Sequence, residues 1–199
     1  AAQQGDAARV SSMLGKDADI EFKTEEGKTP LLLASEGGHL DAVAALIEAK
    51  AAVDAQDRSG RTALALASMK GKADVAGLLI AKGADLNIKD FDGLTPLMHA
   101  AENEFGEIAK QLVEAGADLE AVDGQGRTAL MWASAKGNME IVQTLLAKGA
   151  SLASVAKDGT TPLMSAAKGP NTEIVNLLLD KGADIKAAAK ELFWRHGFK

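Results

Sequence analysis

The chain has 199 residues, and its 22 Lys and Arg against 28 Asp and Glu give a formal net charge of −6 at pH 7. This acidic balance argues against a general binder of nucleic acid or anionic membranes, because such proteins bind through clustered Lys and Arg. The sequence contains no cysteine, which excludes disulfide bonds, thiolate nucleophiles and thiolate metal ligands. No apolar run approaches the ~18 residues that cross a membrane as a helix.

A period of 33 residues runs through the chain. Five Thr-x-Leu tripeptides recur at this spacing, and a glycine precedes each threonine by two positions. The threonines are Thr29, Thr62, Thr95, Thr128 and Thr161. Four further glycines keep the same period, and these are Gly83, Gly116, Gly149 and Gly182. Several registers in phase over five copies indicate stacked repeats rather than one globular core.

The period predicts the organisation of the whole chain as one domain over residues 1–199. Residues 1–23 are predicted to be a truncated first repeat, because Ala1-Ala2 and Gly5 align with Ala34-Ser35 and Gly38. We expect at least one more helical turn upstream in the natural protein. Five full repeats are predicted at 24–56, 57–89, 90–122, 123–155 and 156–188, and residues 189–199 are predicted to form a C-terminal capping helix.

Each full repeat is predicted to contain two helices and a hairpin loop. Thr29 before Pro30 favours a helix start, because threonine caps free N–H groups and proline suits the first helical position. A second helix is predicted near Leu40 to Ala49, and the residue after it is glycine in the later units but Lys50 in the first. Glycine suits the left-handed conformation that closes a helix, so Lys50 is expected to be strained there.

Residues 90–101 read Asp-Phe-Asp-Gly-Leu-Thr-Pro-Leu-Met-His-Ala-Ala, and residues 83–87 read Gly-Ala-Asp-Leu-Asn. These segments, with the period of 33, resemble the ankyrin-repeat family, whose motif is Asp-x-x-Gly-x-Thr-Pro-Leu-His-x-Ala and later Gly-Ala-Asp-Val-Asn. The resemblance covers residues 1 to about 188 and implies an all-α solenoid that binds partners on its concave face. Glu104 and Pro170 replace the family's glycine between the two helices, so we expect remodelled turns at both.

No constellation of catalytic or metal-binding residues emerges from the sequence. Residues 124–129 match Gly-x-Gly-x-x-Ala, but they lie in a repeat hairpin rather than between a parallel strand and a long helix. The histidines His39, His99 and His196 lack zinc-binding spacing. His99 and Glu102 are three residues apart on one helix and are interpreted as a surface pair. We therefore predict no enzymatic activity, no catalytic residue, no cofactor and no metal.

The candidate binding residues come from the hairpin tips and from the inner helices, which by resemblance form the concave face. Phe91 and Leu94 are large apolar residues at a hairpin tip, where they are expected to serve as anchors rather than core; the alternative is that Phe91 folds back onto its neighbour. His99 and Trp132 are expected to adjoin them. The full predicted set is Arg58, Arg61, Met69, Lys70, Phe91, Asp92, Leu94, His99, Glu102, Asn103, Gln125, Arg127, Trp132, Lys136, Lys157 and Lys168.

The resulting functional hypothesis is a monomeric, non-enzymatic module that binds another protein through its concave face and inhibits or masks it, with an enzyme as one possible partner. The basic rim around the apolar centre favours a partner with an acidic surface, and nucleic acid and membrane are not expected. The alternative is a structural or assembly protein that self-associates through its ends. Phe193, Trp194 and Phe198 are interpreted as a cap on the last repeat, or otherwise as a binding tail. A bacterial source is favoured, and export to the periplasm slightly over the cytoplasm.

Overall fold

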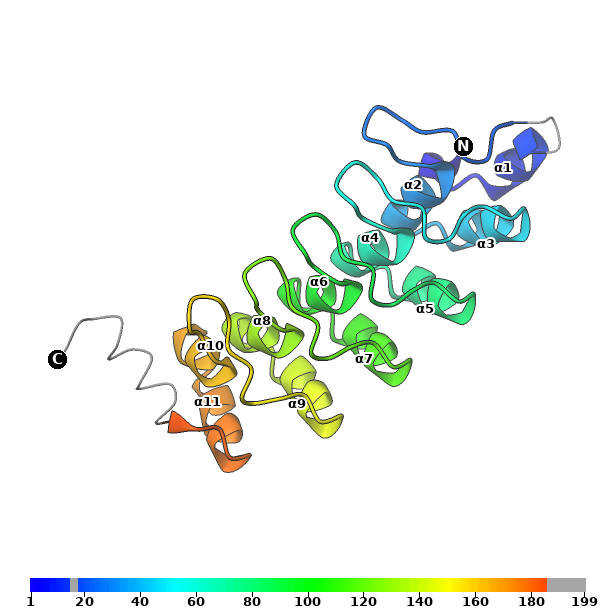
Figure 1. Cartoon of the computed structure of the whole chain (residues 1–199). Coiled ribbons are helices and arrows are strands. Elements are labelled where there is room, and N and C mark those ends of the chain that lie inside the picture. The colour runs from blue at the N-terminus through cyan, green and yellow to red at the C-terminus, as the bar shows by residue number, and fades with distance from the viewer. Residues whose placement is uncertain (15–17, 186–199) are drawn as a thin grey trace.

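The computed structural model describes residues 1–14 and 18–185 (Figure 1). Every regular element in these ranges is a helix, which confirms the all-α fold. They are the 3-10 helix η1 (Ala2–Gln4) and the α-helices α1 (Ala7–Leu14), α2 (Pro30–Gly37), α3 (Leu40–Glu48), α4 (Ala63–Met69), α5 (Ala73–Ala81), α6 (Pro96–Glu102), α7 (Gly106–Glu114), α8 (Ala129–Lys136), α9 (Met139–Ala147), α10 (Pro162–Lys168) and α11 (Thr172–Asp180). The predicted capping helix at 189–199 lies outside the described residues.

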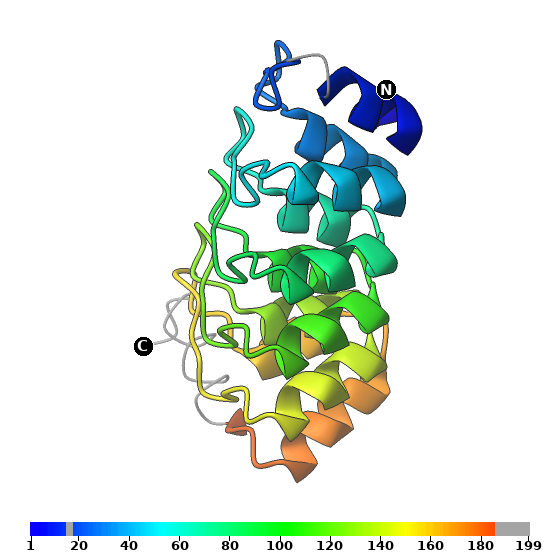
Figure 2. The same cartoon turned by 90° about the vertical axis from the view of Figure 1, so that its right-hand side faces the viewer.

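The helices form two rows (Figure 1). The inner row contains α2, α4, α6, α8 and α10, and the outer row contains α3, α5, α7, α9 and α11, with α1 beside α3. The loops between units extend away from the helices on one side (Figure 2). The helix–helix–hairpin solenoid predicted from the repeat is therefore confirmed.

The inner helices begin as the sequence predicts. The side-chain oxygen of the threonine before each one accepts the backbone N–H group three residues on, at 3.2 to 3.4 Å. The five capping residues are Thr29, Thr62, Thr95, Thr128 and Thr161. Each bond satisfies a donor that the helix itself leaves unpaired.

The two turns that lack the usual glycine behave differently. Glu104 keeps the left-handed conformation with φ 65, as Gly38, Gly71 and Gly137 do, so the expected remodelling there is wrong. At Pro170 the turn is remodelled: proline cannot adopt a positive φ, and α10 ends at Gly169 in an extended conformation. Asn171 then caps α11 by accepting the N–H group of Glu173 at 3.0 Å.

The core lies between the two rows, and the inner helices are almost wholly buried. Leu66, Met98 and Met131 are at most 1% exposed. Neighbouring units supply most of the surroundings of these side chains, because each pair of helices has too little apolar surface to enclose its own. The core therefore fixes the spacing of the inner helices and, with it, the surface that they share with the hairpins.

The hairpin tips are joined by one backbone hydrogen bond at each step. The N–H groups of Arg58, Phe91, Gly124 and Lys157 donate to carbonyl groups of the preceding tip, at 2.9 to 3.0 Å. These bonds align the hairpins in register along one side of the solenoid. We call the surface between the hairpins and the inner helices the concave face.

Candidate protein-binding surface

A groove of about 480 Å³ lies at the middle of the concave face. The hairpins of the second, third and fourth units and the inner helices α4, α6 and α8 contribute its walls. It is lined by Ser59, Arg61, Met69, Asp90, Asp92, Leu94, His99, Glu102, Asn103, Gln125, Arg127 and Trp132. We call this the central groove.

The central groove brings together ten of the sixteen predicted binding residues. The other six lie outside its lining, and these are Arg58, Lys70, Phe91, Lys136, Lys157 and Lys168. The groove is also lined by Ser59 and Asp90, which the predicted set leaves out. The signal for Asp90 was present, because an aspartate recurs at the start of three consecutive hairpins with the period of the repeat.

Three buried aspartates hold the hairpins that border the groove. Asp57, Asp90 and Asp123 are 5 to 7% exposed. Each Oδ1 atom accepts the backbone N–H groups two and four residues on, at distances between 2.8 and 3.0 Å. A carboxylate that accepts two N–H groups closes the loop on itself, so each hairpin has a fixed backbone.

The Oδ2 atoms of Asp57 and Asp123 each accept a hydrogen bond from an arginine of the same hairpin, whereas Oδ2 of Asp90 does not. Arg61 donates through Nε to Asp57 at 2.9 Å, and Arg127 donates in the same way to Asp123 at 2.8 Å. Trp132 adds a bond from Nε1 to Asp123 at 3.1 Å. The Arg127 guanidinium also stacks over the Trp132 ring, with 3.9 Å from Cζ to the ring centroid.

In the third hairpin the donor is an imidazole. His99 is 4% exposed, and its Nε2 atom lies 2.8 Å from Oδ2 of Asp90. Position 94, where the second and fourth units have arginine, is a leucine here. The inner helix thus supplies to Asp90 the hydrogen bond that the hairpin itself supplies in the neighbouring units.

The hydrogen bonds of two of these aspartates lower their pKa values. Burial of Asp57 would by itself raise its pKa, but the Arg61 side chain and the backbone N–H groups of Arg61 and Ser59 outweigh it and hold the pKa below the ordinary 3.8. Burial of Asp123 acts in the same direction and is likewise outweighed by backbone N–H groups and the Arg127 side chain. Both aspartates are therefore held in the charged form.

The comparison with known families decides what kind of solenoid this is. A family model described as ankyrin repeats (3 copies) matches residues 1–90 and 97–189. The chain belongs to the ankyrin-repeat family. No curated protein matches it. Ankyrin repeats are generally protein-interaction modules and typically non-enzymatic.

Among residues 1–14 and 18–185 of this ankyrin-repeat chain, no three His, Asp or Glu side chains gather in a way that could hold a metal ion. In the same part of the chain, no helix combines the length and the apolar character that crossing a membrane requires.

The apolar patch expected at the centre of the ankyrin-repeat chain is not present as predicted. Leu94 is 9% exposed and packs in the core, because the hairpin turns its side chain inward while His99 bonds Asp90. His99 is buried as well, and its partner is Asp90 rather than Glu102. The expected surface pair of His99 and Glu102 is therefore wrong.

Phe91 is 79% exposed, the largest exposed fraction among the exposed large hydrophobic residues of the described chain. Its ring nevertheless lies against the preceding hairpin, since a Cβ atom on Gly60 would come within 2.7 Å of Cδ1 of Phe91. The interpretation that Phe91 folds back onto its neighbour thus holds in part, because the ring contacts Gly60, while its role as an anchor for a partner stays a prediction.

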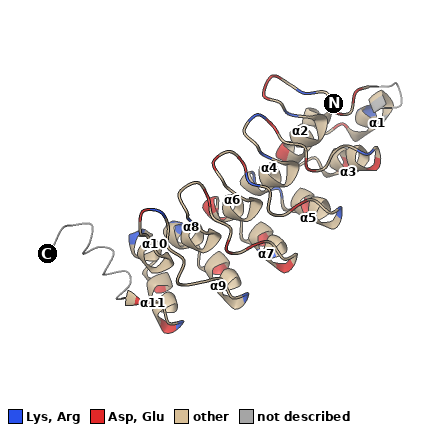
Figure 3. Cartoon of the chain, viewed as in Figure 1, with Lys and Arg blue, Asp and Glu red and all other residues tan. Residues whose placement is uncertain are grey.

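On the concave face, two arginines are paired with aspartates, whereas the basic residues of the rim are mainly exposed lysines. Arg61 and Arg127 form ion pairs with Asp57 and Asp123. The exposed lysines Lys70, Lys136, Lys157 and Lys168 lie outside the groove lining. Figure 3 shows acidic residues at the end of α6 and basic residues at the ends of α8 and α10. The basic rim therefore consists mainly of lysines, while the two arginines are neutralised by their own hairpins.

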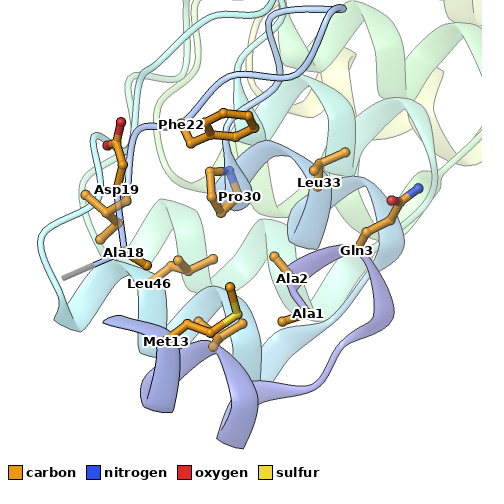
Figure 4. A pocket seen from close by; sticks show the side chains of 12 residues that line it. Ala1, Ala2, Gln3, Met13, Ala18, Asp19, Phe22, Pro30, Leu33 and Leu46 are labelled. Carbon is orange, nitrogen blue, oxygen red and sulfur yellow. The ribbon is translucent and has the colours of Figure 1, made fainter. Parts of the chain in front are cut away.

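A second hollow of about 360 Å³ lies at the N-terminal end of the ankyrin-repeat chain (Figure 4). Its lining is mostly apolar and includes Met13, Phe22, Pro30 and Leu46. Phe22 is 64% exposed and Met13 is 46% exposed. We call this the N-terminal pocket.

Proposed function

We propose that this ankyrin-repeat protein binds another protein through its concave face and, by covering that partner, inhibits or masks it. The observation that carries the proposal is the central groove, whose walls come from three consecutive hairpins with buried carboxylates. A surface whose backbone is already fixed loses little conformational entropy when it binds, and this raises affinity.

The composition of the face supports the same proposal. Phe91 offers an aromatic ring that is 79% exposed beside the groove, and aromatic residues near the centre of an interface often dominate its binding energy. The rim lysines Lys70, Lys136, Lys157 and Lys168 favour acidic groups at the periphery of the partner, which would speed association and make it sensitive to salt. A partner covered in this way is closed to other molecules, which is how binding alone would inhibit an enzyme.

The test compares two exposed phenylalanines. The wild-type chain serves as bait in its native cell, the captured partner is identified by mass spectrometry, and affinity is measured by calorimetry. Phe91→Ala is expected to weaken binding by about 30-fold, which corresponds to about 2 kcal/mol. Phe22→Ala is the matched control, because it removes an exposed ring from the N-terminal pocket and is expected to leave the affinity unchanged. If Phe91→Ala binds as tightly as wild type, the concave-face proposal fails.

The N-terminal pocket favours a second candidate function, which is assembly through the ends of the solenoid. Exposed apolar surface around Phe22 is the kind of patch that buries itself against another chain. Sedimentation equilibrium over a wide concentration range separates the two functions. A mass that stays at one chain contradicts the assembly function, whereas self-association that Phe22→Ala weakens would support it.

A further inference from the structure

The uncompensated charge at the centre of the groove is negative. Asp92 and Glu102 line the central groove, and neither takes part in the ion pairs that the described residues form. The nearest arginines along the chain, Arg61 and Arg127, are paired with buried aspartates of their own hairpins. A partner group placed between Asp92 and Glu102 therefore meets acceptors whose charge is not yet neutralised.

A second, independent observation comes from His99, which lines the same groove. Its Nδ1 atom is buried and has no hydrogen-bond partner. Nε2 lies 2.8 Å from a carboxylate oxygen of Asp90, so the imidazole donates to Asp90 through Nε2 and Nδ1 is the ring atom left without a partner. Buried polar atoms without a partner are rare, and each one calls for an explanation such as a missing ligand.

Asn103 adds a further acceptor to the central groove. Its amide nitrogen donates to the carbonyl oxygen of His99 at 2.9 Å, which leaves its Oδ1 atom as an acceptor. The Nε2 donor of His99 and the amide nitrogen of Asn103 are thus engaged within the protein. The acceptors that remain available to a partner at this point include the carboxylates of Asp92 and Glu102 and the amide oxygen of Asn103.

We propose that the centre of the groove binds an arginine side chain of the partner protein. A guanidinium carries five N–H donors in a planar fork, so it can satisfy several acceptors at once, and it remains charged at all physiological pH values. The proposal rests on the proposed function, since it names the group that the concave face recognises. The rim lysines on both sides favour acidic residues near that arginine, so the recognised segment is a basic side chain within acidic surroundings.

The test uses a displayed library of random short peptides as the probe, selected against the full chain. Selected peptides are expected to be enriched in arginine beside acidic residues. One selected peptide is then synthesised with arginine and with citrulline, its uncharged isostere, and citrulline is expected to weaken binding about tenfold. Enrichment of lysine in place of arginine would overturn the assignment of a guanidinium, and equal binding of the two peptides would overturn the proposal.

Matched variants locate the site. Glu102→Gln and Asp92→Asn are each expected to weaken the arginine peptide about fivefold, and each should reduce the difference between arginine and citrulline. Glu114→Gln makes the same change at the exposed end of α7, and is expected to leave binding unchanged. Circular dichroism confirms that each variant is folded.

The outcomes separate this inference from the proposed function. Peptides that shift the backbone resonances of the central groove but carry no arginine would overturn the inference and leave concave-face binding in place. Peptides that shift only resonances of the outer helices would overturn both. A library from which no concave-face binder emerges also counts against both.

Discussion

The three middle hairpins and the two outer hairpins of the solenoid are built on the same repeat but are held differently. In the middle, Asp57, Asp90 and Asp123 each accept two backbone N–H groups and a side-chain donor. The first hairpin has Thr24 in this position, and its hydroxyl oxygen accepts the N–H group of Lys28 at 3.2 Å. The fifth begins at Ala156, which has no polar side chain.

This difference shows which hairpins have a backbone held by a buried carboxylate. The central groove is lined by residues of the three hairpins that have buried aspartates. No residue of the first or fifth hairpin lines it. A fixed backbone is what a binding surface needs, whereas an end unit needs only to cover its neighbour. The aspartates therefore mark the part of the concave face that is prepared to bind.

Removal of one carboxylate from a middle hairpin should lower the stability of the protein more than the matching change in an outer hairpin. Asp90→Ala leaves two backbone N–H groups and the His99 imidazole without an acceptor, and is expected to lower the free energy of unfolding by about 3 kcal/mol. Thr24→Ala, the matched change in the first hairpin, is expected to cost about 1 kcal/mol. Urea unfolding measures both. Equal losses would show that the middle hairpins gain nothing special from their aspartates.

The stabilisation of the middle hairpins depends on pH, because the pKa values of Asp57 and Asp123 are lowered in the folded protein. Their stabilisation is present above the unfolded-state value of about 3.8 and is lost as the pH falls through the lower folded-state value. The urea midpoint of wild type is therefore expected to fall as the pH drops below about 3.8. Asp123→Asn cannot titrate and should show a shallower decline. Parallel curves for the two proteins would contradict this account.

The smallest effect concerns the end of the first full unit. Lys50 has φ 71, in the position that Gly83, Gly116, Gly149 and Gly182 occupy in the later units. Lys50→Gly is expected to raise the free energy of unfolding by up to about 1 kcal/mol, because it removes the strain of a left-handed residue with a side chain. Gly83→Ala is the mirror control: its new Cβ atom would meet nothing within 4 Å, so any loss reports the backbone alone. Thermal unfolding measures both, and no change in either would mean that the strain is relieved elsewhere.

Most of the fold could be predicted from the sequence, because its signals are local and repeated. Threonine caps, Pro30 at a first helical position and the strain at Lys50 each depend on neighbours within one turn. The turn at Glu104 could not be predicted, because a glutamate can adopt the left-handed conformation at some cost in free energy. The turn at Pro170 could be predicted, because the proline ring excludes a positive φ.

The candidate site was only partly predictable, and Leu94 shows why. A hairpin aspartate can receive a side-chain hydrogen bond from the residue four positions on, as Asp57 does, from the residue nine positions on, as Asp90 does, or from both, as Asp123 does. Leu94 has no side-chain donor, so Asp90 receives this bond from His99, and Leu94 packs in the core. The bond from His99 is a contact between a hairpin and a helix, which hydrophobic periodicity does not encode.

The single backbone hydrogen bond between successive hairpin tips has a mechanical consequence. A force that pulls the two ends apart passes through each interface between units in turn, since a unit touches only its neighbours. The interfaces are thus loaded in series, and the weakest one yields first. Each unit that then unravels releases one repeat of chain, roughly 110 Å when extended.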